Sequence, residues 1–184
     1  MSDLGRREFL ARSRAQLPVS VYFDEALFAR ERETLFKGGP GYVGHQLMVP
    51  ETGDYFALPA EREGRVLVRS AEGVELMSNV CRHRQAIMLN GRGNAGNIVC
   101  PLHRWTYDLQ GQLIGAPHFE QDPCLNLRNY PLTSWNGLLF EDNGRDIEAD
   151  LAGMGPRAAL SFDGMVLDHV ELHTCNYNWK TFIE

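Results

Sequence analysis

Residues 81–103 read CRHRQAIMLNGRGNAGNIVCPLH, and this stretch decides the fold. It contains two Cys/His pairs, Cys81 with His83 and Cys100 with His103, and sixteen residues separate His83 from Cys100. A structural zinc site usually draws its cysteines as a close pair two to four residues apart. Here each close pair is mixed, so each loop offers one thiolate and one imidazole. This suits a two-metal cluster in which each loop gives its cysteine to one metal ion and its histidine to the other.

The two pairs supply the donor set of a Rieske [2Fe–2S] centre, in which two imidazoles replace two thiolates on one of the irons. Three glycines between the pairs allow the chain to turn back, so that the two loops can face each other. We therefore expect Cys81, His83, Cys100 and His103 to hold a [2Fe–2S] cluster. Zinc is the alternative metal.

The other cysteines and histidines are interpreted as packed side chains, because a lone Cys or His is more often buried in a core than bound to metal. They are Cys124, Cys175, His45, His118, His169 and His173. The last two are four residues apart, but they lie in or beside an alternating run at Val166–Leu172 that predicts a strand. We therefore do not expect them to be iron ligands.

Outward from the Cys/His pairs, short apolar runs alternate with turn signals, as is typical of a small antiparallel β domain. The expected strands lie in Tyr42–Val49, Tyr55–Leu58, Arg65–Val68, Val74–Val80, Asn97–Cys100, Trp105–Leu109 and Leu138–Glu141. Before them, Asp24 can cap a helix over residues 24–37, which the glycine-rich residues 38–41 would end. The expected fold class is mainly β, an antiparallel domain over residues 41–145 with an N-terminal helical extension.

The composition of the 184-residue chain excludes several classes of protein. Hydrophobic residues make up 43% and charged residues 23%, a balance that can bury a core. The net charge of -6 argues against a nucleic-acid partner, and no run of about 18 apolar residues could span a membrane. Arg6 and Arg7 are not followed by the apolar stretch of an export signal. We expect a cytoplasmic protein with neither nucleic acid nor membrane as a partner.

The segment Cys81–Pro117 resembles the Rieske domain of bacterial ring-hydroxylating oxygenases. The matching residues are Cys-Arg-His-Arg at 81–84, Cys-Pro-Leu-His at 100–103, Trp105, Tyr107, Asp108, Gly111 and Pro117. The likeness extends back through residues 42–45 to the N-terminal helix, and forward to residues 178–180 and Glu184. Almost the whole chain is therefore covered by the resemblance.

Several residues near the pairs bear on the properties of the cluster. Gln85 and Arg104 stand where the family commonly has glycine. Trp105 occupies the place of a serine that donates a hydrogen bond to the cluster in high-potential Rieske proteins, so we expect a low potential of about -150 mV. Residues 81–107 carry four arginines, Arg84 among them, and no Asp or Glu, and these charges would stabilise the reduced cluster and attract an acidic donor protein. Arg84 and Trp105 are expected to neighbour the cluster without binding iron.

The resemblance identifies the chain as the N-terminal Rieske portion of the large, or alpha, subunit of a Rieske non-haem iron oxygenase. It implies an N-terminal helical segment at 1–40, a Rieske [2Fe-2S] domain at 41–150 and the beginning of an α+β catalytic domain at 151–184. The mononuclear non-haem iron of the family, held by two histidines and a carboxylate, would belong to a part that follows Glu184. We therefore expect the natural chain to continue past this residue, and no catalytic residue is assigned.

The function that the resemblance implies is that of a mono- or dioxygenase. The cluster would accept electrons from a reductase or ferredoxin and pass them to the mononuclear iron, for O2-dependent hydroxylation or demethylation of a small organic substrate. The usual trimer of the family implies a homo-oligomer. The alternative is a stand-alone Rieske ferredoxin, a pure electron carrier, although such a carrier needs neither the N-terminal helix nor about forty C-terminal residues.

Overall fold

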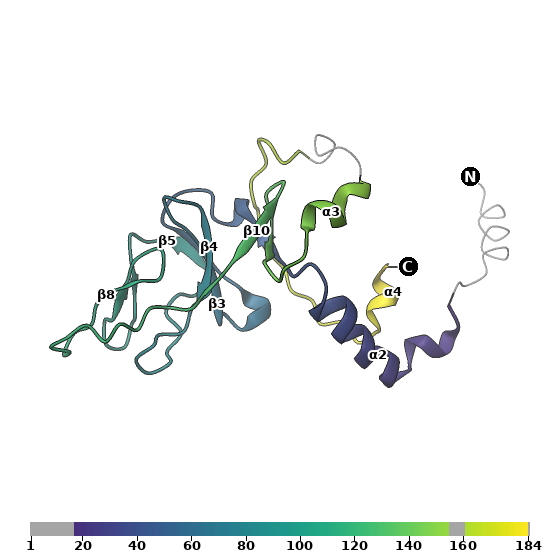
Figure 1. The fold of residues 1–184 in the computed structure, drawn as a ribbon, viewed down its shortest axis with the longest axis horizontal. Coiled ribbons are helices and arrows are strands. Elements are labelled where there is room, and N and C mark those ends of the chain that lie inside the picture. Colours follow the sequence, from purple (N-terminus) through teal and green to yellow (C-terminus); the bar gives the residue numbers. More distant parts are fainter. Residues whose placement is uncertain (1–16, 155–160, 184) are drawn as a thin grey trace. The chain divides into compact units, whose positions relative to one another are not determined.

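The structure is a computed structural model that describes residues 17–154 and 161–183. The chain forms two compact units (Figure 1). The strand-rich unit comprises residues 40–172. The helical unit combines the N-terminal residues up to Gly39 with the residues from His173 onward.

Three sheets make up the described part of the strand-rich unit, and all their strand pairs are antiparallel. The first sheet has the order β1 (Tyr42–His45), β11 (Leu138–Glu141), β10 (Leu132–Trp135). The central sheet has the order β5 (Arg92–Asn94), β2 (Asp54–Ala57), β3 (Arg65–Arg69), β4 (Val74–Ser78), β9 (Asn129–Tyr130). The third sheet has the order β6 (Ile98–Val99), β7 (Thr106–Tyr107), β8 (Leu113–Gly115). Short helices of this unit are η3 (Gln46–Met48), η4 (Pro59–Glu61), α3 (Ile147–Leu151) and η5 (Ala152–Met154).

The central sheet is buried on both faces. Val66, Leu67 and Val68 follow one another in β3, and all three are fully buried. Successive side chains of a strand point to opposite faces, so Val66 and Val68 join one core cluster and Leu67 joins another. Burial of each such side chain contributes about 1.5–3 kcal/mol to the free energy of unfolding. The first of these clusters includes Cys81 and Cys100, so the motif cysteines lie on a well-packed face.

The third sheet carries the second Cys/His pair between β6 and β7. The turn after β7 is fixed by Asp108, whose carboxylate accepts the N–H groups of Gln110 at 2.9 Å and Gln112 at 2.8 Å. Gly111 closes this turn with a φ of +82°, and an added Cβ there would lie 3.2 Å from the Leu127 side chain. Glycine is therefore required by both backbone conformation and space.

The helical unit joins residues that lie far apart in the sequence. Its helices are η1 (Val19–Tyr22), α2 (Glu25–Glu31), η2 (Arg32–Lys37), a π-helical continuation of α2, and α4 (Trp179–Ile183). Asp24 caps α2, because its Oδ1 accepts the N–H of Leu27 at 2.9 Å. At the end of α2, Glu31 accepts hydrogen bonds from Lys180 Nζ at 2.8 Å and from Trp179 Nε1 at 3.0 Å. One carboxylate thus ties α4 to α2.

The structure confirms the mainly β, antiparallel class with an N-terminal helical segment. Each of the seven expected strand regions overlaps a strand of the structure. The sequence analysis does not predict β5, β8, β9 and β10, which have two to four residues each. The strand expected at Val166–Leu172 is wrong: this segment pairs with no strand in the described residues, and Val166 is 88% exposed.

The expectation of packed side chains is also wrong for most of the remaining cysteines and histidines. The exposed ones are Cys124, Cys175, His118, His169 and His173. They lie in segments that form neither helix nor strand, so no sheet or helix face covers them. His45 is half-buried, and its ring packs edge-on against Phe162 with 4.6 Å between centroids.

Within the described residues, no helix combines the length and apolar character needed to cross a membrane. Arg6 and Arg7, which the sequence does not predict to be an export signal, and Glu184, which belongs to the family resemblance, lie outside the described residues.

Candidate metal centre

The two Cys/His pairs lie in two loops with the same backbone hydrogen bonds, which we name the first ligand loop (residues 81–86) and the second ligand loop (residues 100–105). In each loop the cysteine N–H donates to the carbonyl five residues later, and the N–H four residues later donates to the cysteine carbonyl. These distances are 2.9 and 3.0 Å in the first ligand loop, and 2.8 and 3.0 Å in the second. Each loop therefore closes the same turn around its own cysteine.

Both ligand loops hold a non-glycine residue in the left-handed backbone region. Gln85 has a φ of 55° and Arg104 a φ of 59°, and each is the fourth residue after its cysteine. These are the two positions at which the family that the sequence resembles commonly has glycine. The left-handed conformation costs an L-residue roughly 1–2 kcal/mol. The loops therefore keep the turn in spite of a local strain.

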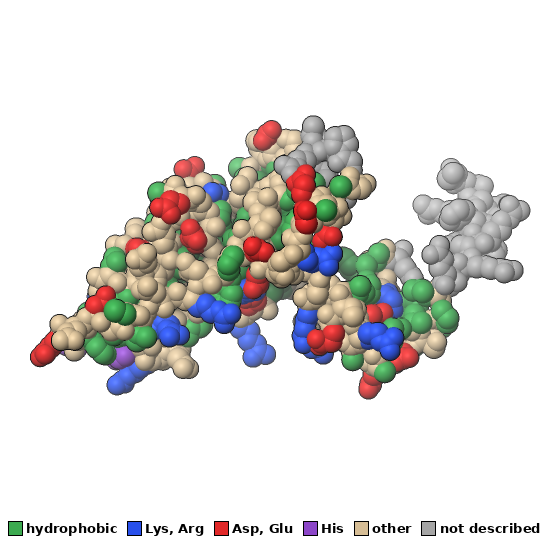
Figure 2. Space-filling model, viewed as in Figure 1, with side chains coloured by type: hydrophobic (Ala, Val, Ile, Leu, Met, Phe, Trp, Pro, Cys, Tyr) green, Lys and Arg blue, Asp and Glu red, His purple; other side chains and the backbone are tan. Residues whose placement is uncertain are grey.

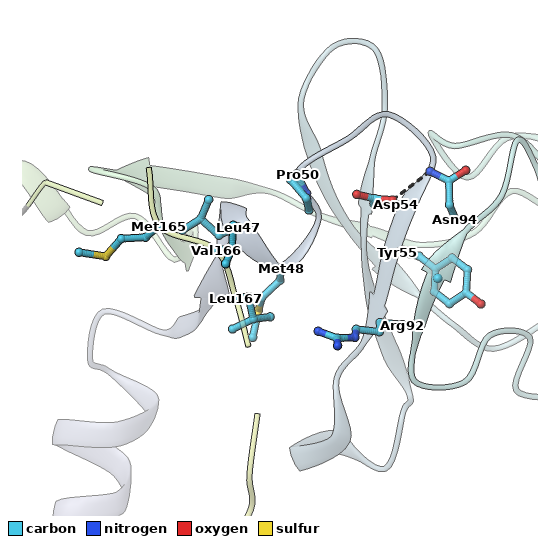
Figure 3. A pocket seen from close by; sticks show the side chains of 11 residues that line it. Leu47, Met48, Pro50, Asp54, Tyr55, Arg92, Asn94, Met165, Val166 and Leu167 are labelled. Carbon is cyan, nitrogen blue, oxygen red and sulfur yellow. Dashed lines mark hydrogen bonds between the residues drawn. The ribbon is translucent and has the colours of Figure 1, made fainter. Parts of the chain in front are cut away.

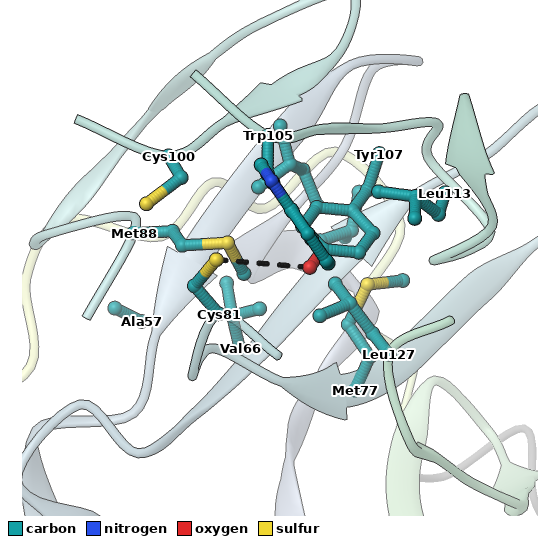
Figure 4. Packing of buried hydrophobic residues seen from close by; sticks show 12 residues of the cluster. Ala57, Val66, Met77, Cys81, Met88, Cys100, Trp105, Tyr107, Leu113 and Leu127 are labelled. Carbon is teal, nitrogen blue, oxygen red and sulfur yellow. Dashed lines mark hydrogen bonds between the residues drawn. The ribbon is translucent and has the colours of Figure 1, made fainter. Parts of the chain in front are cut away.

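The two cysteine side chains lie inside a core cluster of the strand-rich unit (Figure 4). Cys81 is 1% exposed and Cys100 is 2% exposed. Burial raises the pKa of the Cys81 thiol, and the neighbouring Cys100 acts in the same direction. The Tyr107 hydroxyl lies 3.7 Å from Cys81 Sγ and accepts the N–H of Arg82 at 3.2 Å. Positive metal ions would favour the thiolate form of these buried groups.

The two histidine rings of the pairs are also neighbours. The centroids of His83 and His103 are 4.7 Å apart, in an edge-to-face arrangement. The Nδ1 atom of each ring is buried and has no hydrogen-bond partner in the described residues. Burial lowers the pKa of His83, with His103 and Arg84 acting in the same direction, which favours the neutral imidazole that binds metal. These two orphaned nitrogens are the atoms to which iron would bind.

Trp105 supports one of these rings. Its indole stacks on His83 with 4.9 Å between centroids and 6° between planes. Phe119 packs edge-on against both, at 5.9 Å from His83 and 5.2 Å from Trp105. Trp105 is 1% exposed, whereas Arg84, the other expected neighbour of the cluster, has an exposed side chain. The two aromatic side chains thus cover His83.

The donors fit a [2Fe–2S] cluster. In the part of the chain that the structure describes, no group of three or more His, Cys, Asp or Glu residues is placed to hold a metal ion on its own. The four motif side chains instead form two like pairs, one of buried thiols and one of imidazoles. A Rieske cluster takes two donors of each kind.

Exposed arginines lie around the ligand loops. Arg82, Arg84 and Arg104 are exposed and form no ion pair with any described residue. Arg92 is separate, since its Nη1 donates to the Asp168 carbonyl at 3.0 Å. Figure 2 shows Lys and Arg side chains gathered along the lower edge of the strand-rich part, where a histidine also reaches the surface.

A cavity of about 550 Å³ lies apart from the ligand loops, beside β2 and β5 (Figure 3). Its lining comprises Leu47, Met48, Pro50, Asp54, Tyr55, Arg92, Gly93, Asn94, Met165, Val166 and Leu167. Asp54 is already used, because its carboxylate accepts hydrogen bonds from Asn94 Nδ2 at 2.9 Å and from the Glu51 N–H at 2.8 Å. No Cys or His lines this cavity, so it takes no part in the candidate metal centre.

Sequence reasoning assigned no role to two residues at this centre. Tyr107 matches the resembling family, but its contact with Cys81 joins residues 26 positions apart and depends on the pairing of β7. Phe119 lies in an irregular segment after Pro117, where no periodic pattern indicates what it contacts. The family match at Tyr107 was the one available signal.

Residues 40–131 match the family model described as the Rieske [2Fe-2S] domain. Putrescine 2-hydroxylase of Ralstonia nicotianae is 67% identical over 184 residues, which cover 100% of this chain and 50% of the relative. Putrescine 2-hydroxylase of Bordetella bronchiseptica is 55% identical, with 100% of this chain and 46% of the relative covered. The chain spans about half the length of the curated relatives it matches.

Among solved structures, naphthalene 1,2-dioxygenase from Rhodococcus sp. bound to indole has a TM-score of 0.61 and 28% identity. The match covers 78% of this chain and 35% of that chain. The similarity to both hydroxylases runs beyond residues 40–131 in each direction, because it includes the whole chain.

Proposed function

Because the chain belongs to the Rieske [2Fe-2S] domain family, we propose that it forms the electron-accepting portion of the terminal component of a Rieske non-haem iron oxygenase. The observation that supports it is that Cys81 and Cys100 are buried in one core cluster, while the neighbouring rings of His83 and His103 have buried Nδ1 atoms without a partner in the described residues. Cys81, His83, Cys100 and His103 would hold the cluster. When bound, a Rieske cluster supplies one-electron transfer.

The surrounding side chains have separate roles in this proposal. Trp105 and Phe119 fix the orientation of the His83 ring and keep water from it. The Tyr107 hydroxyl accepts a hydrogen bond from the Arg82 N–H and lies next to Cys81 Sγ. The exposed Arg84 adds positive charge beside the ligand loops, which favours the form of the protein that has gained an electron.

For the chain as a whole we propose the division into a helical segment at 1–40, a Rieske domain at 41–150 and the start of an α+β catalytic domain at 151–184. The separate strand-rich unit supports the boundary near residue 40, and relatives of about twice the length support a further domain. The mononuclear iron would be bound by that further domain. We also propose that the whole protein is a cytoplasmic homotrimer. It would receive electrons from a reductase or ferredoxin and would consume O2.

For the substrate of the whole protein we propose a short aliphatic diamine such as putrescine. The support is the identity of 67% over the full chain to a putrescine 2-hydroxylase, against 28% to the naphthalene dioxygenase. An aromatic substrate is the second candidate. A stand-alone Rieske ferredoxin is not favoured, because the hydroxylases match the helical unit as well as the strand-rich unit.

Metal analysis of the purified chain tests the cluster. We expect two irons and two acid-labile sulfides per chain, and after reduction an electron paramagnetic resonance signal with an average g well below that of an all-cysteine cluster. Cys100→Ser should lose this signal, whereas the matched control Cys124→Ser, at an exposed cysteine, should keep it. One zinc ion without sulfide would contradict the proposal.

The substrate is tested with the whole protein and a chemical or enzymatic electron supply. We expect putrescine to stimulate O2 consumption and to yield a product heavier by one oxygen atom in mass spectrometry. An aromatic acid or hydrocarbon serves as the comparison. Turnover of the aromatic compound with none of putrescine would reverse the order of the two candidates.

A further inference from the structure

A small cavity of about 210 Å³ touches the first ligand loop. The residues that line it are Ser78, Val80, Cys81, Arg82, Gln85, Arg128 and Tyr130. They come from the end of β4, from Val80 just before the loop, from the loop itself and from β9 with the residue before it. Cys81, a candidate iron ligand, forms part of the wall, and no Asp or Glu does.

The cavity carries unmatched positive charge. Arg82 and Arg128 are exposed, and neither forms an ion pair in the described part of the chain. The Arg128 guanidinium lies 4.8 Å from the centre of the Tyr130 ring, a cation–π contact that keeps it at the cavity. Two arginines thus line a hollow that has no carboxylate in its lining.

Arg65 provides an internal contrast. Its guanidinium lies 4.9 Å from the centre of the same Tyr130 ring. Glu61 and Glu141 both accept hydrogen bonds from it, the second at 2.6 Å, so its charge is balanced within the unit. Of these two cations on one aromatic ring, Arg128 is the one without a carboxylate partner in the described residues, so it can bind a carboxylate of another molecule.

The polar groups of the cavity suit a carboxylate. A guanidinium donates two parallel hydrogen bonds to a carboxylate, and the Gln85 amide can donate another. The lining is held in place, because the Ser78 N–H donates to the Arg128 carbonyl at 2.8 Å. A cationic hollow of fixed shape attracts an anionic partner and sets its orientation.

We propose that this cavity receives a carboxylate side chain of an acidic electron-donor protein and holds that protein against the first ligand loop. The inference rests on the proposed function and adds the face at which the donor binds. Free carboxylate or phosphate ions share the recognition chemistry, so the test includes one of them.

Charge reversals in the full chain, loaded with its cluster, test the proposal. Arg128→Glu and Arg82→Glu alter the cavity, and Arg104→Glu makes the same change of charge on the second ligand loop, outside the lining. Stopped-flow absorption follows reduction of the cluster by a reduced plant-type ferredoxin, an acidic carrier protein used as the probe. At low salt we expect the rate constant to fall about tenfold for Arg128→Glu and by no more than about twofold for Arg104→Glu. About 0.5 M salt should remove most of this difference.

Two controls separate docking from damage to the protein. Reduced methyl viologen, a small cation, should reduce the cluster of Arg128→Glu at least as fast as that of the parent. Arg128→Gln, which removes the charge without reversing it, should give an intermediate loss with the ferredoxin.

Equal losses in Arg128→Glu and Arg104→Glu, or no loss in either, would overturn the proposal. So would equal inhibition of the ferredoxin reaction of the parent and of Arg128→Glu by millimolar inorganic phosphate at constant ionic strength, because the anion would then act outside the cavity. A parent chain without a [2Fe–2S] spectrum would instead refute the proposed function.

Discussion

The strand-rich unit and the helical unit are each stabilised internally by a different kind of interaction. Around the ligand loops, Cys81, Cys100, Trp105 and Tyr107 pack in one apolar cluster, and none is more than 2% exposed. The helical unit joins α2 to α4 through the hydrogen bonds of Glu31, beside an edge-on ring contact at 5.3 Å between Phe36 and Trp179. Its exposed large apolar side chains include Val19, Phe23, Phe28, Leu35, Phe36, Phe182 and Ile183.

This difference teaches where the candidate metal centre obtains its rigidity. The ligand loops are positioned by the apolar core of the strand-rich unit, which includes Trp105 and Tyr107 besides the two motif cysteines. The link between α2 and α4 depends on an ionised carboxylate. Substitutions in the two units should therefore have separable effects on the cluster and on the α2–α4 contact.

The largest expected effect is that of Trp105→Ala. It removes a fully buried indole from the core and from the face of His83, so we expect a loss of roughly 3–5 kcal/mol in the free energy of unfolding. It should also alter the electron paramagnetic resonance signal of any cluster that remains, because the His83 ring loses its support. Urea unfolding and the resonance spectrum measure the two effects.

Trp135→Ala is the matched control within the same unit. Trp135 is 4% exposed and packs with Phe140 and Ile147, in a cluster that contains neither motif cysteine. A similar loss of unfolding free energy with an unchanged resonance signal is expected. If both variants change the signal alike, the core as a whole, and not the stacked indole, positions His83.

Tyr107→Phe should have a smaller effect. It leaves the Arg82 N–H without its acceptor and removes the hydroxyl next to Cys81 Sγ, so we expect a loss of about 1 kcal/mol in unfolding free energy. Loss of a hydrogen bond to a ligating sulfur should also lower the reduction potential. Redox titration measures this shift. Tyr177→Phe, at an exposed tyrosine of the helical unit, should leave the potential unchanged.

The two units also differ in how far their structure could be predicted from the sequence. Cys81, His83, Cys100 and His103 form a local pattern whose spacing carries its chemistry, and the structure brings their side chains together in two pairs. The left-handed backbone at Gln85 and Arg104 is visible in the sequence only against the glycine of the family.

The contacts of the helical unit have no such local pattern. Glu31 and Lys180 are 149 residues apart, and although Lys180 lies in the family match at residues 178–180, nothing in the sequence indicates Glu31 as its partner. A pairing of this kind depends on the path of the whole chain between its members. The support of His83 by Phe119 escapes prediction for the same reason.

Acid should weaken the α2–α4 contact. Hydrogen bonds from Lys180 and then Trp179 lower the pKa of Glu31 below its ordinary value. A carboxyl whose pKa is lowered by folding stabilises the contact above its unfolded pKa, about 4.3, and this contribution is lost as the pH falls through the folded pKa. The indole N–H resonance of Trp179 in nuclear magnetic resonance spectra should therefore shift as the pH falls through the folded pKa of Glu31, which lies below about 4.3.

Glu31→Gln is the control for this titration. The amide oxygen can still accept the Trp179 N–H, but the group no longer ionises, so the shift with acid should disappear. The cluster spectrum should be the same in both proteins. A shift that persists in Glu31→Gln would assign the acid sensitivity to another group.

The smallest expected effect concerns the strain in the ligand loops. Gln85→Gly and Arg104→Gly each remove an L-residue from the left-handed region, which should raise the free energy of unfolding by about 1 kcal/mol. Glycine also raises the entropy of the unfolded chain, which should lower the free energy of unfolding by about 0.5–1 kcal/mol. The net gain in unfolding free energy should be a few tenths of a kcal/mol, and it should be alike in the two loops because their turns share the same hydrogen bonds. Arg62→Gly, at a φ of 53° outside the ligand loops, gives the gain expected from backbone strain alone. A clear loss of stability at Gln85 or Arg104, with a gain at Arg62, would mean that these side chains stabilise their loops by contacts that outweigh the strain.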